Sequence, residues 1–123
     1  MGTIEFSTSD IVEPKGRATG RLVVKIGQRI LSNDTVRLLF RDVLVYIVDE
    51  EYILKLPLPW GASKNRFIIT NEDVPVHPSG RDFFYPESYG GYTIETHYDR
   101  GRAIKVLSDL CNKLELEFEA IDA

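Results

Sequence analysis

AIKVLSDLCNKL, residues 103–114, carries the clearest structural pattern in this chain. Its apolar residues recur three and four positions apart, and polar or charged residues fill most of the positions between them. This spacing predicts an amphipathic α-helix, with Asp99 as the residue that caps its N-terminus. The apolar stripe needs an apolar surface to cover, so we expect the helix to lie across one face of a β-sheet. The stripe consists of Ala103, Ile104, Leu107, Leu110, Cys111 and Leu114.

The segment after the helix has the two-residue period of a β-strand. In LEFEAI, residues 116–121, apolar residues alternate with glutamates, which predicts a closing strand with one buried face. The glutamates would form a charged outer face that discourages pairing with further strands, and an acidic docking ridge is the alternative. They are Glu115, Glu117 and Glu119.

Six segments before the helix have the composition of strands. RLVVKIG alternates in polarity and ends in a Gly27-Gln28 pair that suits a tight turn. TVRLLF and VLVYIV are near-continuous apolar runs typical of central strands, and EYILKLPL would return from them as a hairpin. The predicted class is α+β, with a mainly antiparallel sheet of about six to eight strands, one amphipathic C-terminal helix packed on a face, and the closing strand. The six segments are RLVVKIG (21–27), TVRLLF (35–40), VLVYIV (43–48), EYILKLPL (51–58), RFIIT (66–70) and YTIETHY (92–98).

Length and composition predict one soluble domain over residues 1–123. A chain of 123 residues can bury a core without disulfides or metal. Residues 1–20 are expected to form a mobile or looping stretch, because they contain turn-forming residues and neither the apolar run of a signal peptide nor the length of a membrane span. The single cysteine, Cys111, falls in the helical stripe, so we expect a buried thiol and a reducing, cytoplasmic location.

Motifs that would name a reaction do not occur in the sequence. No serine lies in a G-x-S-x-G elbow, and the glycines are too dispersed to form a phosphate-binding loop. We therefore expect a protein without a cofactor and with a binding role rather than an enzymatic one.

The longest segment without a strand or helix pattern is NEDVPVHPSGRDFFYPESYGG, residues 71–91, and it is rich in aromatic residues. Long ordered connections in small domains usually carry function, and aromatic residues and arginine dominate binding interfaces. Phe83 and Phe84 are neighbours, so in an extended chain they face opposite sides. We predict that this loop, with the neighbouring acidic surface, binds a protein partner, and packing of its rings against the end of the sheet is the alternative. The predicted partner-binding residues are Trp60, Arg81, Asp82, Phe84, Tyr85 and Tyr89.

Two kinds of protein partner are compatible with these features. A small acidic domain of strands with a late helix is similar in outline to bacterial immunity and inhibitor proteins, which neutralise a toxin by covering its active site. The similarity covers architecture and the net charge of −4, and it implies a protein partner. A homo-oligomer is the other expectation, because VLVYIV would pair between subunits if it lay at the border of the sheet.

A metal-dependent or acid–base enzyme is the first alternative function. Glu95 and His97 lie two residues apart and would point to the same side of a strand, with Asp99 following. His77, the only other histidine, would have to approach from the loop to complete a site of two histidines and a carboxylate.

Nucleic-acid binding is the second alternative. Residues 15–29 contain five basic residues and no carboxylate, whereas the excess of acidic residues lies in residues 62–123. The acidic net charge opposes this reading, so we expect nucleic acid and membranes not to be partners. The basic residues are Lys15, Arg17, Arg21, Lys25 and Arg29.

Overall fold

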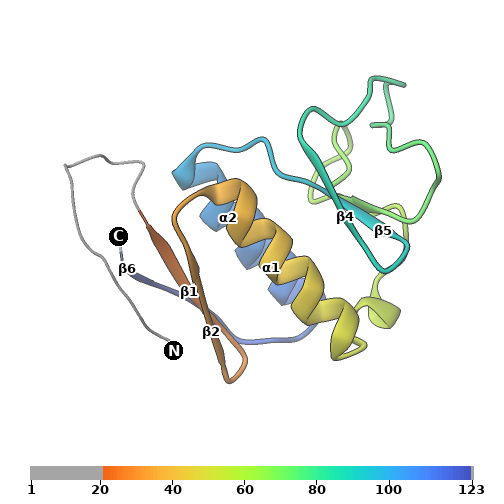
Figure 1. The fold of residues 1–123 in the computed structure, drawn as a ribbon. Coiled ribbons are helices and arrows are strands. Elements are labelled where there is room, and N and C mark those ends of the chain that lie inside the picture. Colours follow the sequence, from red (N-terminus) through yellow and green to blue (C-terminus); the bar gives the residue numbers. More distant parts are fainter. Residues whose placement is uncertain (1–20, 123) are drawn as a thin grey trace.

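Two helices lie between two small antiparallel sheets in the computed structural model, which describes residues 21–122 (Figure 1). The predicted mobile stretch at residues 1–20 lies outside the described residues. The α+β class and the antiparallel pairing are confirmed, but a single sheet with one helix was wrong. The elements are β1 (Leu22–Ile26), β2 (Arg29–Asn33), α1 (Val36–Asp49), the 3-10 helix η1 (Tyr52–Lys55), β3 (Ile69–Thr70), β4 (Pro86–Tyr89), β5 (Tyr92–Glu95), α2 (Arg100–Lys113) and β6 (Phe118–Asp122).

The first sheet has the strand order β2-β1-β6. Alternate residues of β1 are buried, as its two-residue period predicts, and Gly27 makes the turn to β2 with a φ of +59°. A side chain at this φ would be strained, which explains glycine at the turn. The closing strand is present as β6, which pairs antiparallel with β1 and places Phe118 opposite Ile26.

TVRLLF and VLVYIV form one helix, α1, so the prediction of two central strands was wrong. The Thr35 side chain caps α1 by accepting a hydrogen bond from the Leu38 N–H at 3.1 Å. The buried residues of α1 follow the helical period, but additional apolar residues on the other faces hide that period in the sequence. VLVYIV is therefore no edge strand, and the proposed pairing of subunits through it does not apply. The buried set is Leu39, Phe40, Val43, Leu44, Tyr46 and Ile47.

EYILKLPL does not return as a hairpin strand. Glu51 takes a left-handed conformation with a φ of 65°, and the chain continues into η1. Ile53 and Leu56 then enter the hydrophobic core from a helical turn instead of from a sheet.

The second sheet has the order β3-β5-β4 and contacts α1 through β4 and β5. RFIIT is extended only at Ile69 and Thr70, and the segment 71–91 was wrongly expected to contain no strand, because its end forms β4. Pro86 is the first residue of this edge strand, a position where the missing N–H costs no ladder hydrogen bond.

Helix α2 confirms the predicted amphipathic helix and its cap. The Asp99 side chain accepts a hydrogen bond from the Arg102 N–H at 2.8 Å, and the buried residues of α2 join those of α1 and β1 in one core. Cys111 is 1% exposed, which confirms the expected buried thiol, and burial raises its pKa to about 12. Within residues 21–122, neither helix is long and apolar enough to cross a membrane.

Candidate functional site

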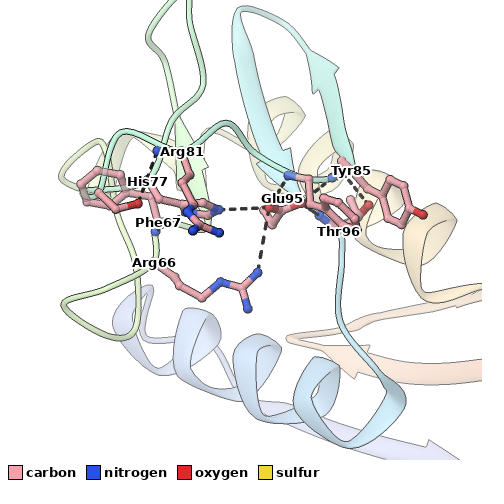
Figure 2. Close-up of polar contacts among 9 residues, drawn as sticks. Arg66, Phe67, His77, Arg81, Tyr85, Glu95 and Thr96 are labelled. Atoms are coloured by element: carbon pink, nitrogen blue, oxygen red, sulfur yellow. Dashed lines mark hydrogen bonds and ion pairs between the residues drawn. The ribbon is translucent and has the colours of Figure 1, made fainter.

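Glu95 is the centre of a buried hydrogen-bond network (Figure 2). It is the last residue of β5 and is 0% exposed. One carboxylate oxygen, Oε1, accepts a hydrogen bond from the Phe84 N–H at 2.8 Å. The other, Oε2, accepts from the N–H groups of Tyr85 at 2.8 Å and Thr96 at 3.1 Å. Three backbone donors from two segments of the chain therefore meet at one carboxylate.

His77 joins this network from the long loop. Its Nε2 lies 3.2 Å from Glu95 Oε1, and its Nδ1 lies 3.1 Å from the backbone nitrogen of Phe67. Because a backbone N–H can only donate, Nδ1 accepts, and the proton of the neutral ring is on Nε2, which donates to Glu95. The ring also stacks on buried Phe83 with centroids 4.8 Å apart. Both ring nitrogens are occupied, so the ring is held in place between Glu95 and the backbone of Phe67.

The surroundings of Glu95 keep its carboxylate ionised. Burial is the largest single effect and raises the pKa, but hydrogen bonds from three backbone N–H groups and from His77 together outweigh it and lower the pKa below its ordinary value of 4.5. Arg66 adds a cation 4.0 Å from Oε1. Glu95 thus acts as a fixed negative charge around which the chain is organised.

Phe84, Tyr85 and His97 form a cluster of exposed rings beside this network, which we call the aromatic patch. Phe84 is 60% and Tyr85 46% exposed, and their ring centroids are 4.8 Å apart. The imidazole of His97, also exposed, meets both rings edge-on at 4.2 and 5.0 Å. Two neighbouring large side chains therefore stay in contact with each other while facing solvent.

The backbone beneath the aromatic patch is fixed on both sides of Tyr85. Its N–H donates to Glu95, and its carbonyl oxygen accepts from the Thr96 hydroxyl at 2.6 Å and the Thr96 N–H at 3.1 Å. Such bonding restricts the backbone on both sides of Tyr85.

Charged side chains of α1 and β4 border the aromatic patch. The Arg37 Nε forms an ion pair with Glu87 Oε2, and the Arg41 Nε lies 3.9 Å from Glu87 Oε1. The Arg37 guanidinium also lies 5.9 Å from the centroid of the Tyr85 ring. Two cations face one carboxylate here, so the expected acidic border is not found at this place.

The structure separates the predicted partner-binding residues into three groups. Phe84 and Tyr85 lie in the aromatic patch, and the neighbouring Phe83 is buried, which matches the expectation that the two phenylalanines face opposite sides. Arg81 and Asp82 are exposed at another part of the loop. The remaining two, Trp60 and Tyr89, are partly buried and pack against the hydrophobic core.

The candidates for a metal or acid–base site are likewise divided. Glu95 and His77 meet in the buried network, while His97 lies in the aromatic patch because the strand ends at Glu95 and the pair do not share one side. Within the part of the chain that the structure describes, no three His, Cys, Asp or Glu side chains form a group that could hold a metal ion.

The basic segment is partly neutralised by acidic neighbours. Arg21 pairs with Asp34 at 3.6 Å, and Arg29 pairs with Glu50 at 3.8 Å. Lys25 lies opposite Glu119 on β6, and the two remaining basic residues, Lys15 and Arg17, lie outside the described residues.

The hydroxyl of Tyr98 is buried and has no hydrogen-bond partner among residues 21–122. Its ring packs against Phe40 at 5.3 Å and lies 5.1 Å from the Arg66 guanidinium, and burial raises its pKa to about 12. Tyr98→Phe removes only the unsatisfied group, so we expect the free energy of unfolding to stay the same or to rise by up to about 1 kcal/mol in urea denaturation. Tyr89→Phe is the comparison variant, because the Tyr89 hydroxyl donates to Asp49 at 2.8 Å at an exposed position, and loss of this bond should not raise the stability. A clear loss of stability in Tyr98→Phe would contradict this account.

Sequence reasoning named Glu95 and His77 as candidates for a metal or acid–base site but missed their part in holding the backbone beneath the aromatic patch. Glu95 falls on the polar side of YTIETHY, which suggests a solvent-facing carboxylate, and its buried partners come from a loop whose path no local pattern reveals. Comparisons of the chain with models of known families, with curated proteins and with solved structures find no match. Function therefore has to be inferred from the site itself.

Proposed function

We propose that this chain is a non-enzymatic interaction protein that binds a protein partner through the aromatic patch. One observation carries the proposal: the backbone N–H groups of two neighbouring exposed aromatic residues, Phe84 and Tyr85, both donate to the same fully buried carboxylate. Exposure of large apolar rings to water is unfavourable, so their burial against a partner favours association. Aromatic residues are also common anchors of binding interfaces. Because the backbone beneath the rings is already fixed, binding does not have to pay the entropy cost of ordering it.

An inhibitor of the immunity type is the specific form of partner binding that we propose. Such a protein acts by covering another molecule's site, which requires contact area and not reactive groups. The geometry supports this form, because the one buried histidine–carboxylate pair has both ring nitrogens occupied while the rings beside it face solvent.

The double variant Phe84→Ser/Tyr85→Ser tests the proposal. We expect loss of at least about 2 kcal/mol of binding free energy, roughly a thirtyfold weaker complex, because hot-spot aromatics carry most of the affinity. The measurement is capture of proteins from extracts of the native host by the tagged variant and the tagged wild type, followed by mass spectrometry and titration of the captured protein. Circular dichroism should show an unchanged fold, since neither exposed side chain belongs to the core.

A matched control removes equally exposed apolar side chains from elsewhere. Ile30 is 60% and Leu54 71% exposed, and neither belongs to the aromatic patch. The variant Ile30→Ser/Leu54→Ser should bind the partner as the wild type does. Undiminished capture by a folded Phe84→Ser/Tyr85→Ser variant would exclude the aromatic patch as the binding surface.

A further inference from the structure

The charges beside the aromatic patch differ in sign from those of the molecule as a whole. The chain has a net charge of −4, yet Arg37 and Arg41 share the single carboxylate of Glu87. The two arginine side chains remain 55% and 48% exposed, whereas that of Glu87 is 16% exposed. A partner that lies on the rings therefore meets more exposed positive charge than negative charge at this border.

Both guanidinium groups approach Glu87 through Nε. The described contacts with Glu87 do not use the terminal nitrogens of the two guanidinium groups. These nitrogens can therefore donate to a second carboxylate. Arg37 is also placed 5.9 Å from the Tyr85 ring, which ties one of the cations directly to the aromatic patch. An apolar group on the rings and a carboxylate on the arginines would then be only one or two residues apart in a bound chain.

We infer that the aromatic patch binds a short acidic segment of a protein partner, in which an apolar side chain packs on Phe84 and Tyr85 and a flanking carboxylate pairs with Arg37 and Arg41. This inference rests on the proposed function and specifies the chemistry of the partner. Single-stranded nucleic acid also combines flat rings with negative charge, but it needs a continuous track of cations along its phosphates. Among residues 21–122, only two arginines lie together here, both paired with Glu87, and this arrangement suits one carboxylate better than a row of phosphates.

The test uses three probes that are titrated into isotopically labelled protein and followed by NMR at the amides of Phe84, Tyr85 and His97. The probes are the capped peptide GSEFESG, its glutamine counterpart GSQFQSG, and an octathymidylate. We expect the glutamate peptide to shift these amides and to bind at least about threefold more tightly than the glutamine peptide, with the difference shrinking as salt is added. Equal affinity for the two peptides, tighter binding of the oligonucleotide, or binding of none of the probes would overturn the inference.

The variant Arg37→Gln tests whether Arg37 pairs with the carboxylate of the peptide. Arg29→Gln is its matched control. Arg29 is also about half exposed, pairs with a glutamate at 3.8 Å and lies 4.9 Å from a tyrosine ring, that of Tyr46, away from the aromatic patch. The preference for the glutamate peptide should fall roughly threefold in Arg37→Gln and stay unchanged in Arg29→Gln. An unchanged preference in Arg37→Gln would contradict the role given to Arg37.

The two levels of the proposal fail in different ways. If capture of the native partner depends on Phe84 and Tyr85 but no peptide preference for glutamate is found, the aromatic patch is a binding surface and the acidic chemistry is wrong. If capture does not depend on these two residues, the proposed function itself is wrong.

Discussion

We expect Glu95→Gln to lower the free energy of unfolding by about 2–4 kcal/mol. The carboxylate accepts from Phe84 and His77 on one oxygen and from Tyr85 and Thr96 on the other. A glutamine must place its NH₂ group at one of these positions, where it faces two donors and leaves at least one of them, the N–H of Phe84 or of Tyr85, buried without an acceptor. Small domains have only about 5–15 kcal/mol of stability, so this loss is a large fraction of the total.

The dependence of stability on pH gives this prediction a second readout. Because the pKa of Glu95 is lower in the folded protein than its ordinary value of 4.5, its contribution to stability is fully present above pH 4.5. The contribution is lost as the pH falls below 4.5 toward the pKa of the folded state. The stability gap between the wild type and Glu95→Gln, measured by urea denaturation, should therefore be constant near neutral pH and become narrower in acid.

Glu87→Gln is the matched control for loss of a carboxylate. Glu87 lies on the neighbouring strand β4 and pairs with two arginines whose side chains are about half exposed. An amide oxygen can still accept from arginine, so the expected cost is about 1 kcal/mol or less. If Glu95→Gln were as mild as Glu87→Gln, and its stability gap to the wild type were the same at all pH values, Glu95 would not organise the loop.

The same network predicts what happens to the aromatic patch in Glu95→Gln. Phe84 and Tyr85 would keep their side chains but lose part of the bonding that fixes their backbone. Partner binding should then weaken at temperatures where the variant is still folded, because backbone order must be supplied on binding. The backbone N–H groups of the exposed rings are tied to the buried carboxylate, so the two are structurally coupled.

Sequence reasoning succeeded where the period of the pattern agreed with the local composition. In α2, polar residues interrupt the apolar stripe at the expected positions, and Asp99 marks the start. In β1, buried and partly exposed residues alternate along the strand. These two elements, with the turn at Gly27 and the closing strand, could be read from local pattern alone.

The prediction failed at α1, where the amino-acid composition is typical of strands although the buried residues recur with a helical period. The helix is buried between two sheets, so it has apolar residues on more than one face, and many of them are β-branched or aromatic. Such a segment resembles buried strands until its length and its Thr35 cap are weighed together. That one error changed the number of helices, the number of sheets and the expected edge strand.

The geometry of the candidate site could be predicted only in part, because the exposure of its rings follows from the local sequence, whereas the fixing of its backbone depends on distant contacts. The aromatic content of the loop pointed to Phe84 and Tyr85. Neighbouring side chains of an extended chain face opposite sides, which predicted that Phe83 and Phe84 differ in burial. The role of Glu95 depends instead on a loop folding back over β5, and contacts of this range leave no local pattern. His97 was assigned to a metal site because the strand was expected to continue beyond Glu95, where the structure ends it.

Gly61→Ala is expected to destabilise the protein by about 2–4 kcal/mol. A Cβ at Gly61 would lie 1.8 Å from the backbone oxygen of Arg66, and a backbone atom cannot move aside as the end of a flexible side chain can. The two sides of this connection are held together by an isolated bridge at Trp60, whose carbonyl oxygen accepts from the N–H groups of Ile68 at 2.6 Å and Ile69 at 3.1 Å. Separating Gly61 from Arg66 must therefore strain or break these bonds, which urea denaturation would record.

Gly101→Ala is the control that separates a steric clash from the general effect of replacing glycine. A Cβ at Gly101 would meet only Asp99 Oδ1 at 3.7 Å, an ordinary contact, and the residue lies in the first turn of α2. Alanine favours a helix over glycine by up to about 1 kcal/mol, so this variant should be as stable as the wild type or more so. If Gly61→Ala were equally harmless, the close approach to Arg66 would not be a feature of the folded chain. Because Arg66 lies 4.0 Å from Glu95, a displaced Arg66 should also shift the NMR signals of Phe84 and Tyr85, whereas Gly101→Ala should leave them in place.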